Sequence, residues 1–165
     1  MDKLGSNNGH IVGELRLKPL VKTKFVGYGP KFSDFCEWIS TGDIVSVHKD
    51  GNVEIVTHKD DLIYDRNDKL VEHWRMERLM AQEDSIRGVQ VVQVCHGAPV
   101  IAVIVPKSLK GVPEFFKTDL SNLCRNDKLH APDQFAIAAD FPRVNTKIQK
   151  FKLRELIRQK VIVPF

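Results

Sequence analysis

The sequence predicts an α+β fold, a small sheet with helices packed against it, preceded by a β-hairpin segment. Two runs of β-branched residues, 89–94 and 100–105, flank a turn that contains Gly and Pro and indicate two neighbouring strands. Apolar residues at helical spacing in 71–82 and 148–160 indicate amphipathic helices. An Asp-Gly pair at 50–51, between alternating apolar residues, predicts the upstream hairpin.

The first part of the chain reads as β structure with loops. Residues 1–10 are polar and predict a loose lead-in, whereas 12–17 alternate between apolar and polar side chains and predict a strand. Residues 27–36 contain Gly and Pro and predict a long loop. The hairpin has its expected strands at 44–47 and 53–56.

The second part alternates helices and strands. After the helix at 71–82 and the two strands, Pro113 stands at an N1-like position and predicts a helix with Phe115, Phe116 and Leu120 on one face. A last strand is expected at 134–138, before the helix at 148–160. The resulting order of elements is typical of an α+β layer.

Composition and length limit the class of protein. The 165 residues suit one domain, or one domain with an appendage, and 42% apolar residues suffice for a core. The longest uncharged apolar run, 98–106, is far shorter than the ~20 residues of a membrane helix, so no membrane span is expected. The N-terminus has no signal-peptide core and the C-terminus no peroxisomal tripeptide. These features predict an intracellular, cytoplasmic protein.

The net charge of +4 is concentrated near the C-terminus. Between 143 and 160, Glu155 is the one acid among seven basic residues: Arg143, Lys147, Lys150, Lys152, Arg154, Arg158 and Lys160. Such a field attracts a phosphate, a nucleotide or a nucleic acid. A solvated basic helix face is an equally ordinary interpretation.

Cysteine and histidine do not indicate a metal site. Cys36, Cys95 and Cys124 are far apart and odd in number, so we expect buried or half-buried thiols and no disulfide framework. The six histidines never occur at the spacing of metal ligands. No metal is therefore expected to bind this chain.

Several segments, in their order and spacing, resemble the adenylate-forming (AMP-binding) enzymes. This superfamily contains acyl-CoA synthetases, firefly-luciferase-like enzymes and the adenylation domains of peptide synthetases. The resemblance runs from about residue 12 to the end of the chain and is carried by the segments 13–15, 38–44, 50–56, 59–63, 75–79 and 141–155.

The resemblance implies that the chain is the C-terminal portion of such an enzyme. Residues 1–59 would be the terminal β segment of the large adenylation domain, and 60–165 the small C-terminal α+β domain. Asp60 would occupy the hinge between the two domains, about which the family's small domain rotates.

The resemblance also assigns site residues. Asp43, in the Thr41-Gly42-Asp43 tripeptide, would hold the ribose, since a carboxylate can accept hydrogen bonds from both ribose hydroxyls. Lys147 would be the catalytic lysine of adenylation, stabilising charge that develops between the carboxylate and the α-phosphate. His58 occupies the position of the family's ribose-contacting arginine, and imidazole offers fewer donors.

Other departures concern the reaction as a whole. Residues 64–68 replace a glycine-containing loop that helps to form the family's thioester tunnel, and the motif before Lys147 is one residue shorter than usual. The chain contains no Gly/Ser/Thr-rich phosphate loop, and it lacks the large domain with the adenine and acyl pockets. We therefore expect no catalysis by the chain alone.

Two functions remain in view. In the first, the chain is part of an ATP-dependent acyl-adenylate-forming ligase, of the kind found in fatty acid metabolism. That enzyme would use ATP or AMP, Mg²⁺ and, where a thioester forms, CoA, and it would bind a carboxylic (acyl) substrate through the large domain. No cofactor is expected for this chain alone.

In the second function, a degenerate module binds an acidic partner or a nucleic acid through the basic C-terminal helix. Nucleic acid is the less expected partner, because no nucleic-acid-binding motif occurs.

Overall fold

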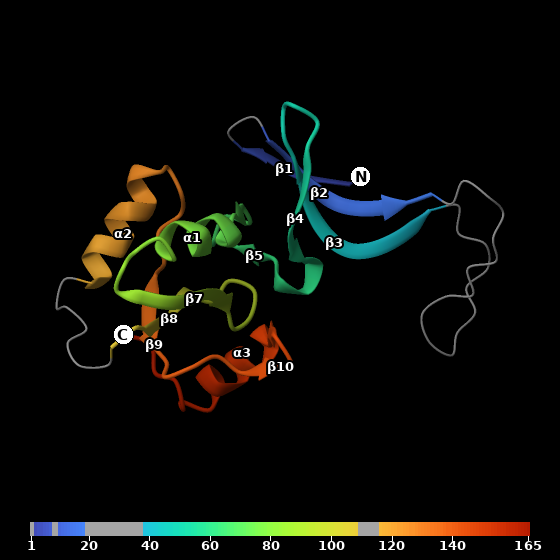
Figure 1. Cartoon of the computed structure of the whole chain (residues 1–165). Helices are drawn as coiled ribbons and strands as arrows, with labels where there is room; N and C mark the ends of the chain where they lie inside the picture. The colour runs from blue at the N-terminus through green and yellow to red at the C-terminus, as the bar shows by residue number, and fades with distance from the viewer. Residues whose placement is uncertain (1, 8–9, 19–37, 109–115) are drawn as a thin grey trace, which may run out of the picture. The chain divides into compact units, whose positions relative to one another are not determined.

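The computed structural model describes residues 2–7, 10–18, 38–108 and 116–165, and Figure 1 shows their secondary structure. Contacts within the chain separate two compact units, unit 1 (Met1–Asp60) and unit 2 (Asp61–Phe165), and each unit is described by itself. The predicted loop at 27–36, Cys36, Pro113 and Phe115 lie outside the described residues.

Unit 1 is an antiparallel sheet in the strand order β1-β2-β3-β4. Its strands are β1 (Asp2–Asn7), β2 (His10–Leu17), β3 (Ile39–Val47) and β4 (Val53–His58). Within 1–10, the prediction of a loose lead-in was wrong for residues 2–7, because they form β1 and pair with β2 through the backbone. An edge strand needs no alternation of apolar side chains to form these hydrogen bonds, so side-chain pattern did not reveal it.

The hairpin of β3 and β4 is confirmed, with longer strands than expected. The His48 N–H donates to the Asn52 carbonyl at 2.9 Å and closes the turn. Gly51 has a φ of +86°, which glycine adopts without strain. Asp50 Oδ1 accepts a hydrogen bond from the Asn52 N–H at 3.0 Å. The Asp-Gly signal therefore acts through both the backbone freedom of Gly51 and the carboxylate of Asp50.

Unit 2 contains a three-stranded sheet in the order β7-β8-β9. Strands β7 (Ile86–Gln93) and β8 (Val100–Pro106) are antiparallel, and β9 (Gln134–Ile137) runs parallel to β8. Every residue of β8 is buried, which explains its continuous apolar sequence, since a central strand covered on both faces has no solvent-facing side. The predicted strands are confirmed.

Helices cover both faces of this sheet. The helices α1 (His73–Met80) and α2 (Phe116–Asn126) share one apolar cluster with alternate residues of β8, among them Ala102 and Ile104. The helix α3 (Lys150–Arg158) shares a second cluster with the intervening residues of β8, among them Val103. The predicted α+β fold with helices packed on a small sheet is confirmed.

Unit 2 also contains two short hairpins that the sequence patterns did not predict. Strands β5 (Ile63–Tyr64) and β6 (Leu70–Val71) enclose the 64–68 segment, whose Asp65 Oδ1 accepts hydrogen bonds from the N–H groups of Asn67 and Lys69. Strands β10 (Arg143–Val144) and β11 (Lys147–Ile148) form the second hairpin. Strands of two residues are too short to leave a periodic pattern in the sequence. None of the described helices is both long and apolar enough to cross a bilayer.

Candidate functional site

The Thr41-Gly42-Asp43 tripeptide lies within β3 and forms a bulge there. Glu14 of β2 pairs with Ile44, and Arg16 pairs with Ser40, so three residues of β3 face a single residue of β2. A bulge bends its strand and redirects the side chains that it carries. Asp43 therefore lies on a distortion of β3.

The carboxylate of Glu14 holds this bulge in place. Glu14 Oε1 accepts hydrogen bonds from Ser40 Oγ at 2.6 Å and from the Gly42 N–H at 3.2 Å. These donors, Ser40 first, hold the pKa of Glu14 below its ordinary value, because they stabilise the ionised carboxylate. Thr41 Oγ1 donates to the Leu15 carbonyl at 2.9 Å and accepts from the Asp43 N–H at 3.0 Å. Hydrogen bonds to Glu14 and Leu15 therefore hold the bulge against β2, and the bond between Thr41 and Asp43 holds it internally.

Gly42 is required where the bulge meets His58. Its φ is +80°, and a Cβ on Gly42 would lie 2.6 Å from His58 Nε2. Asp43 and His58 are register partners across β3 and β4. The structure therefore brings together two of the predicted nucleotide-binding residues, Asp43 and His58, with Gly42 under the imidazole ring.

His58 also contacts Asp60, the predicted hinge residue. The Asp60 N–H donates to His58 Nδ1 at 3.3 Å, and Asp60 Oδ2 lies 3.3 Å from the same nitrogen. A neutral ring accepts the N–H through Nδ1, whereas a protonated ring donates from Nδ1 to the carboxylate. Asp60 is 77% exposed and lies in the short 3-10 helix η1 (Lys59–Asp61), where the two units meet along the chain.

Lys147 is exposed at the start of β11. It pairs with Val144 across a turn in which Asn145 adopts a φ of 55°, a conformation that asparagine tolerates. The Gln149 N–H donates to the Pro142 carbonyl at 2.8 Å and closes the base of this hairpin. Lys147 belongs to unit 2, whereas Asp43, His58 and Asp60 belong to unit 1.

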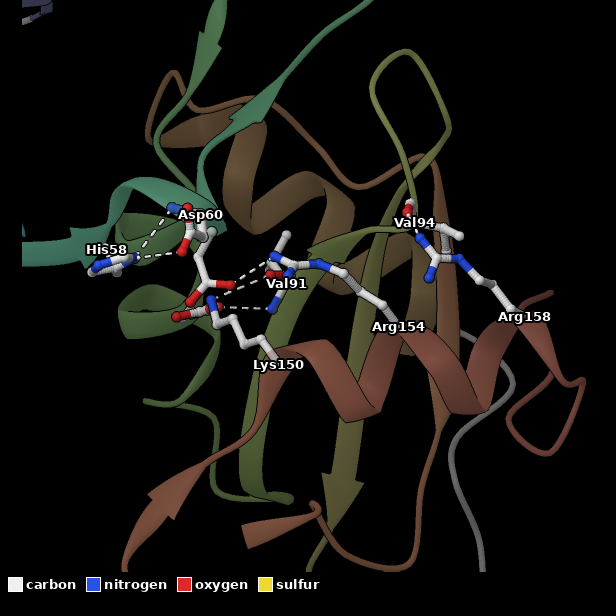
Figure 2. A network of polar contacts seen from close by, with 9 residues as sticks. His58, Asp60, Val91, Val94, Lys150, Arg154 and Arg158 are labelled. Carbon is white, nitrogen blue, oxygen red and sulfur yellow. Dashed lines mark hydrogen bonds and ion pairs between the residues drawn. The ribbon is translucent and has the colours of Figure 1, made fainter. Parts of the chain in front are cut away.

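The basic residues of α3 are partly engaged within unit 2, as Figure 2 shows for Lys150, Arg154 and Arg158. Arg154 Nη2 lies 2.7 Å from Asp61 Oδ1, and Arg158 Nη2 donates to the Val94 carbonyl at 2.6 Å. The alternative of a solvated basic face therefore does not hold for Lys150 and Arg154, which are 12% and 15% exposed, whereas Arg158 remains exposed. Charge engaged in this way is less available to an acidic partner, which weakens the alternative of a binding module.

Glu77 of α1 is the partner of Lys150. Lys150 Nζ lies 2.7 Å from Glu77 Oε1, and the same oxygen accepts the Val91 N–H at 2.8 Å. Burial raises the pKa of the Glu77 carboxyl, although Lys150 and the Val91 N–H oppose this shift. The two side chains are 18% and 12% exposed, so the ion pair is shielded from most of the solvent.

The described cysteines, Cys95 and Cys124, differ in burial. Cys124 is buried, and burial raises the pKa of its thiol to about 11. Cys95 is exposed, so the prediction of a buried or half-buried thiol was wrong for this residue; it lies in the turn between β7 and β8. Across the described ranges, no group of His, Cys, Asp or Glu side chains is arranged to hold a metal ion.

Two curated ligases from Arabidopsis thaliana match nearly the whole chain. The peroxisomal butyrate–CoA ligase is 26% identical over 94% of this chain, and the peroxisomal benzoate–CoA ligase is 27% identical over 97%. The chain spans only 28% and 30% of the length of these two relatives. No protein-family model matches the chain.

Solved structures of CoA ligases are also similar to this chain. A benzoate–CoA ligase from Burkholderia xenovorans LB400 is 28% identical with a TM-score of 0.68, covering 87% of this chain and 30% of that one. In sequence and in fold the chain is similar to part of these CoA ligases, as expected for a C-terminal portion of an adenylate-forming enzyme. An anthranilate–CoA ligase, solved with anthranoyl-AMP, shares the fold at 21% identity and a TM-score of 0.74, over 91% of this chain and 30% of its own.

Two carboxylates with structural contacts near the predicted site residues, Glu14 and Glu77, were not singled out from the sequence. Glu14 lies within the segment 13–15 and Glu77 within 75–79, two of the segments that carry the resemblance. Their partners, Ser40 and Lys150, are 26 and 73 residues away in sequence. Contacts of this range depend on strand register and helix packing, so spacing along the chain contains no signal for them.

Proposed function

We propose that the chain works as the C-terminal part of an ATP-dependent acyl-adenylate-forming ligase of the acyl-CoA synthetase kind. In this role Lys147 assists adenylation, Asp43 and His58 contact the ribose, and Asp60 is the hinge. The observation that carries the proposal is the combination of relatedness to such ligases with an exposed Lys147 on an ordered hairpin. The chain would require the rest of the ligase for activity.

The chemistry of the proposed residues suits ATP. In adenylation a carboxylate oxygen of the acyl substrate bonds to the α-phosphorus, and the bond from that phosphorus to pyrophosphate breaks. Negative charge accumulates between the reacting groups, and the Lys147 ammonium would stabilise it without transferring a proton. Asp43 fits ribose, because an ionised carboxylate accepts hydrogen bonds from two neighbouring hydroxyls. Mg²⁺ would be held by the ATP phosphates, and CoA by the rest of the ligase.

A chimeric ligase tests this role of Lys147. The chain replaces the corresponding C-terminal 30% of the Burkholderia benzoate–CoA ligase, and benzoate-dependent exchange of pyrophosphate into ATP measures adenylation. Lys147→Ala should lower the kcat of exchange roughly 10²- to 10³-fold, the usual effect of removing one group that stabilises charge in the transition state. The isolated chain should show no exchange.

Lys152→Ala is the matched control, because Lys152 is also an exposed lysine near the start of α3. This variant should retain the exchange rate of the unchanged chimera. Equal exchange rates for Lys147→Ala and the unchanged chimera would contradict the assignment of Lys147. If both variants exchange pyrophosphate as fast as the unchanged chimera, the similarity to the ligases would stand, but Lys147 would have no catalytic role.

A further inference from the structure

Three basic side chains of α3 follow one another at intervals of four residues: Lys150, Arg154 and Arg158. Residues four apart lie on one face of a helix, so all three heads project from the same side. Figure 2 shows them reaching from α3 toward the region of Val91 and Val94 of β7 and the following turn. The first of the three lies three residues after Lys147.

Lys150 has the most enclosed contacts of the three. Its ammonium lies 2.7 Å from Glu77 Oε1 and 3.4 Å from the Val91 carbonyl, and the same Glu77 oxygen accepts the Val91 N–H. A lysine side chain that is 12% exposed is held in one position, unlike a solvated lysine on a helix surface. Lys150 therefore links the first residue of α3 to both α1 and β7.

This link lies at the base of the Lys147 hairpin. Gln149 immediately precedes Lys150, and its N–H bonds to the Pro142 carbonyl where the hairpin begins. The helix starts at Lys150 without a side-chain cap at Gln149, so capping contributes nothing to holding its first turn. The ion pair of Lys150 with Glu77 supplies that constraint, and Lys147 is carried on the hairpin above it.

We propose that Glu77 and Lys150 are positioning residues for Lys147: their ion pair fixes the base of the β10–β11 hairpin and so the direction in which Lys147 is presented. The inference rests on the proposed function of Lys147. Lys147 and Lys150 would then have different roles. Lys147 would act on the reacting groups, and Lys150 would act only through the hairpin.

The double substitution Glu77→Gln with Lys150→Met tests this role in the same chimera. It removes both charges together, so no unpaired buried charge remains to unfold the unit. The kcat of pyrophosphate exchange should fall about ten- to a hundredfold, as expected when a reacting group is displaced by a fraction of an ångström or more. The KM values for ATP and benzoate should stay unchanged. The separate single variant Lys150→Arg, which keeps Glu77 and a positive charge at residue 150, should retain most of the kcat.

Arg158→Gln is the matched control. Arg158 lies on the same face of α3 and donates to the Val94 carbonyl, but it is at the far end of the helix from Lys147. This variant should retain the kcat of the unchanged chimera. In the 165-residue chain, hydrogen exchange of the Lys147 and Ile148 amides should accelerate in the double variant and stay unchanged in Arg158→Gln.

The outcomes distinguish this inference from the proposed function. If Lys147→Ala abolishes exchange of pyrophosphate while the double variant leaves kcat unchanged, the positioning role is overturned and the function stands. An equal loss of kcat in Arg158→Gln and in the double variant would also overturn it, because general loosening of α3 would then explain both. If Lys147→Ala itself leaves exchange unchanged, the function of Lys147 is wrong and Lys150 has no catalytic group to position.

Discussion

Burial strongly lowers the pKa of one histidine in unit 2, His73. It is the first residue of α1 and is fully enclosed. Loss of hydration lowers its pKa well below the ordinary value of 6.5, and the nearby charges of Lys150 and Arg154 lower it further. The imidazole is therefore neutral in the folded protein at neutral pH, although it protonates near pH 6.5 once the chain unfolds.

This difference predicts a loss of stability in mild acid. Because the unfolded chain binds a proton that folded His73 does not, the free energy of unfolding should fall as the pH drops below 6.5, by at most about 1.4 kcal/mol per pH unit. His73→Leu should remove this part of the pH dependence. Urea unfolding between pH 7.5 and 5.5, followed by circular dichroism, measures both proteins. Parallel profiles for the two would contradict the prediction.

Residues also show the limit of what sequence can predict about the site. The resemblance proposed Asp43, His58 and Lys147 as site residues, and the structure pairs Asp43 with His58 across β3 and β4. Glu14 and Glu77 were not identified, because each acts on a partner that only the folded chain brings near. A resemblance of motifs proposes which residues meet a ligand, whereas contacts such as Glu14 with Ser40 and Glu77 with Lys150 depend on packing.

At the scale of elements, the reliability of sequence patterns followed the length of the element. Strands β7 and β8 and helices α1 and α3 have long apolar patterns and were predicted. The β5–β6 and β10–β11 hairpins have strands of two residues, and β1 is a polar edge strand, so none of them has a distinctive pattern. The bulge in β3 was also missed, although its glycine was noticed.

That bulge provides a prediction about Gly42. Gly42→Ala should lower the free energy of unfolding by about 1–2 kcal/mol for the positive φ alone, and by roughly 1 kcal/mol more because the new Cβ displaces His58. Gly51→Ala is the matched control: its φ is also positive, but its Cβ would meet no atom within 4 Å. Urea unfolding of both variants measures the difference, and equal losses would show that His58 moves aside freely.

At the scale of the whole molecule, the two units differ in how much apolar surface they bury. Unit 2 contains two clusters, one on each face of its sheet, with Met76 and Phe135 in the first and Val103 and Leu153 in the second. Among the described residues of unit 1, the buried apolar side chains are Val12, Ile44 and Val45. A two-sided core supports independent folding, whereas a sheet with few buried side chains depends on further contacts.

We therefore expect residues 61–165 to fold alone and residues 1–60 to remain without a cooperative transition. The 61–165 fragment retains both apolar clusters, the Glu77–Lys150 pair and the Arg154–Asp61 pair at its first residue. Its amide NMR spectrum should overlay on the corresponding signals of the 165-residue chain, and urea should unfold it in one transition. Asp61→Asn should lower the urea midpoint of the fragment, because Arg154 is only 15% exposed and would lose its carboxylate partner.

The fragment experiment also bears on the hinge proposed at Asp60. If unit 2 keeps its structure when the chain begins at Asp61, the Arg154–Asp61 pair marks where the rigid part starts, and any rotation must occur before that residue. Asp60→Pro in the benzoate–CoA ligase chimera should then alter exchange kinetics, whereas the same substitution in the 165-residue chain should leave the urea midpoint of unit 2 unchanged. A 61–165 fragment that fails to fold would instead show that unit 2 needs contacts from the preceding chain, and a hinge at this position would be untenable.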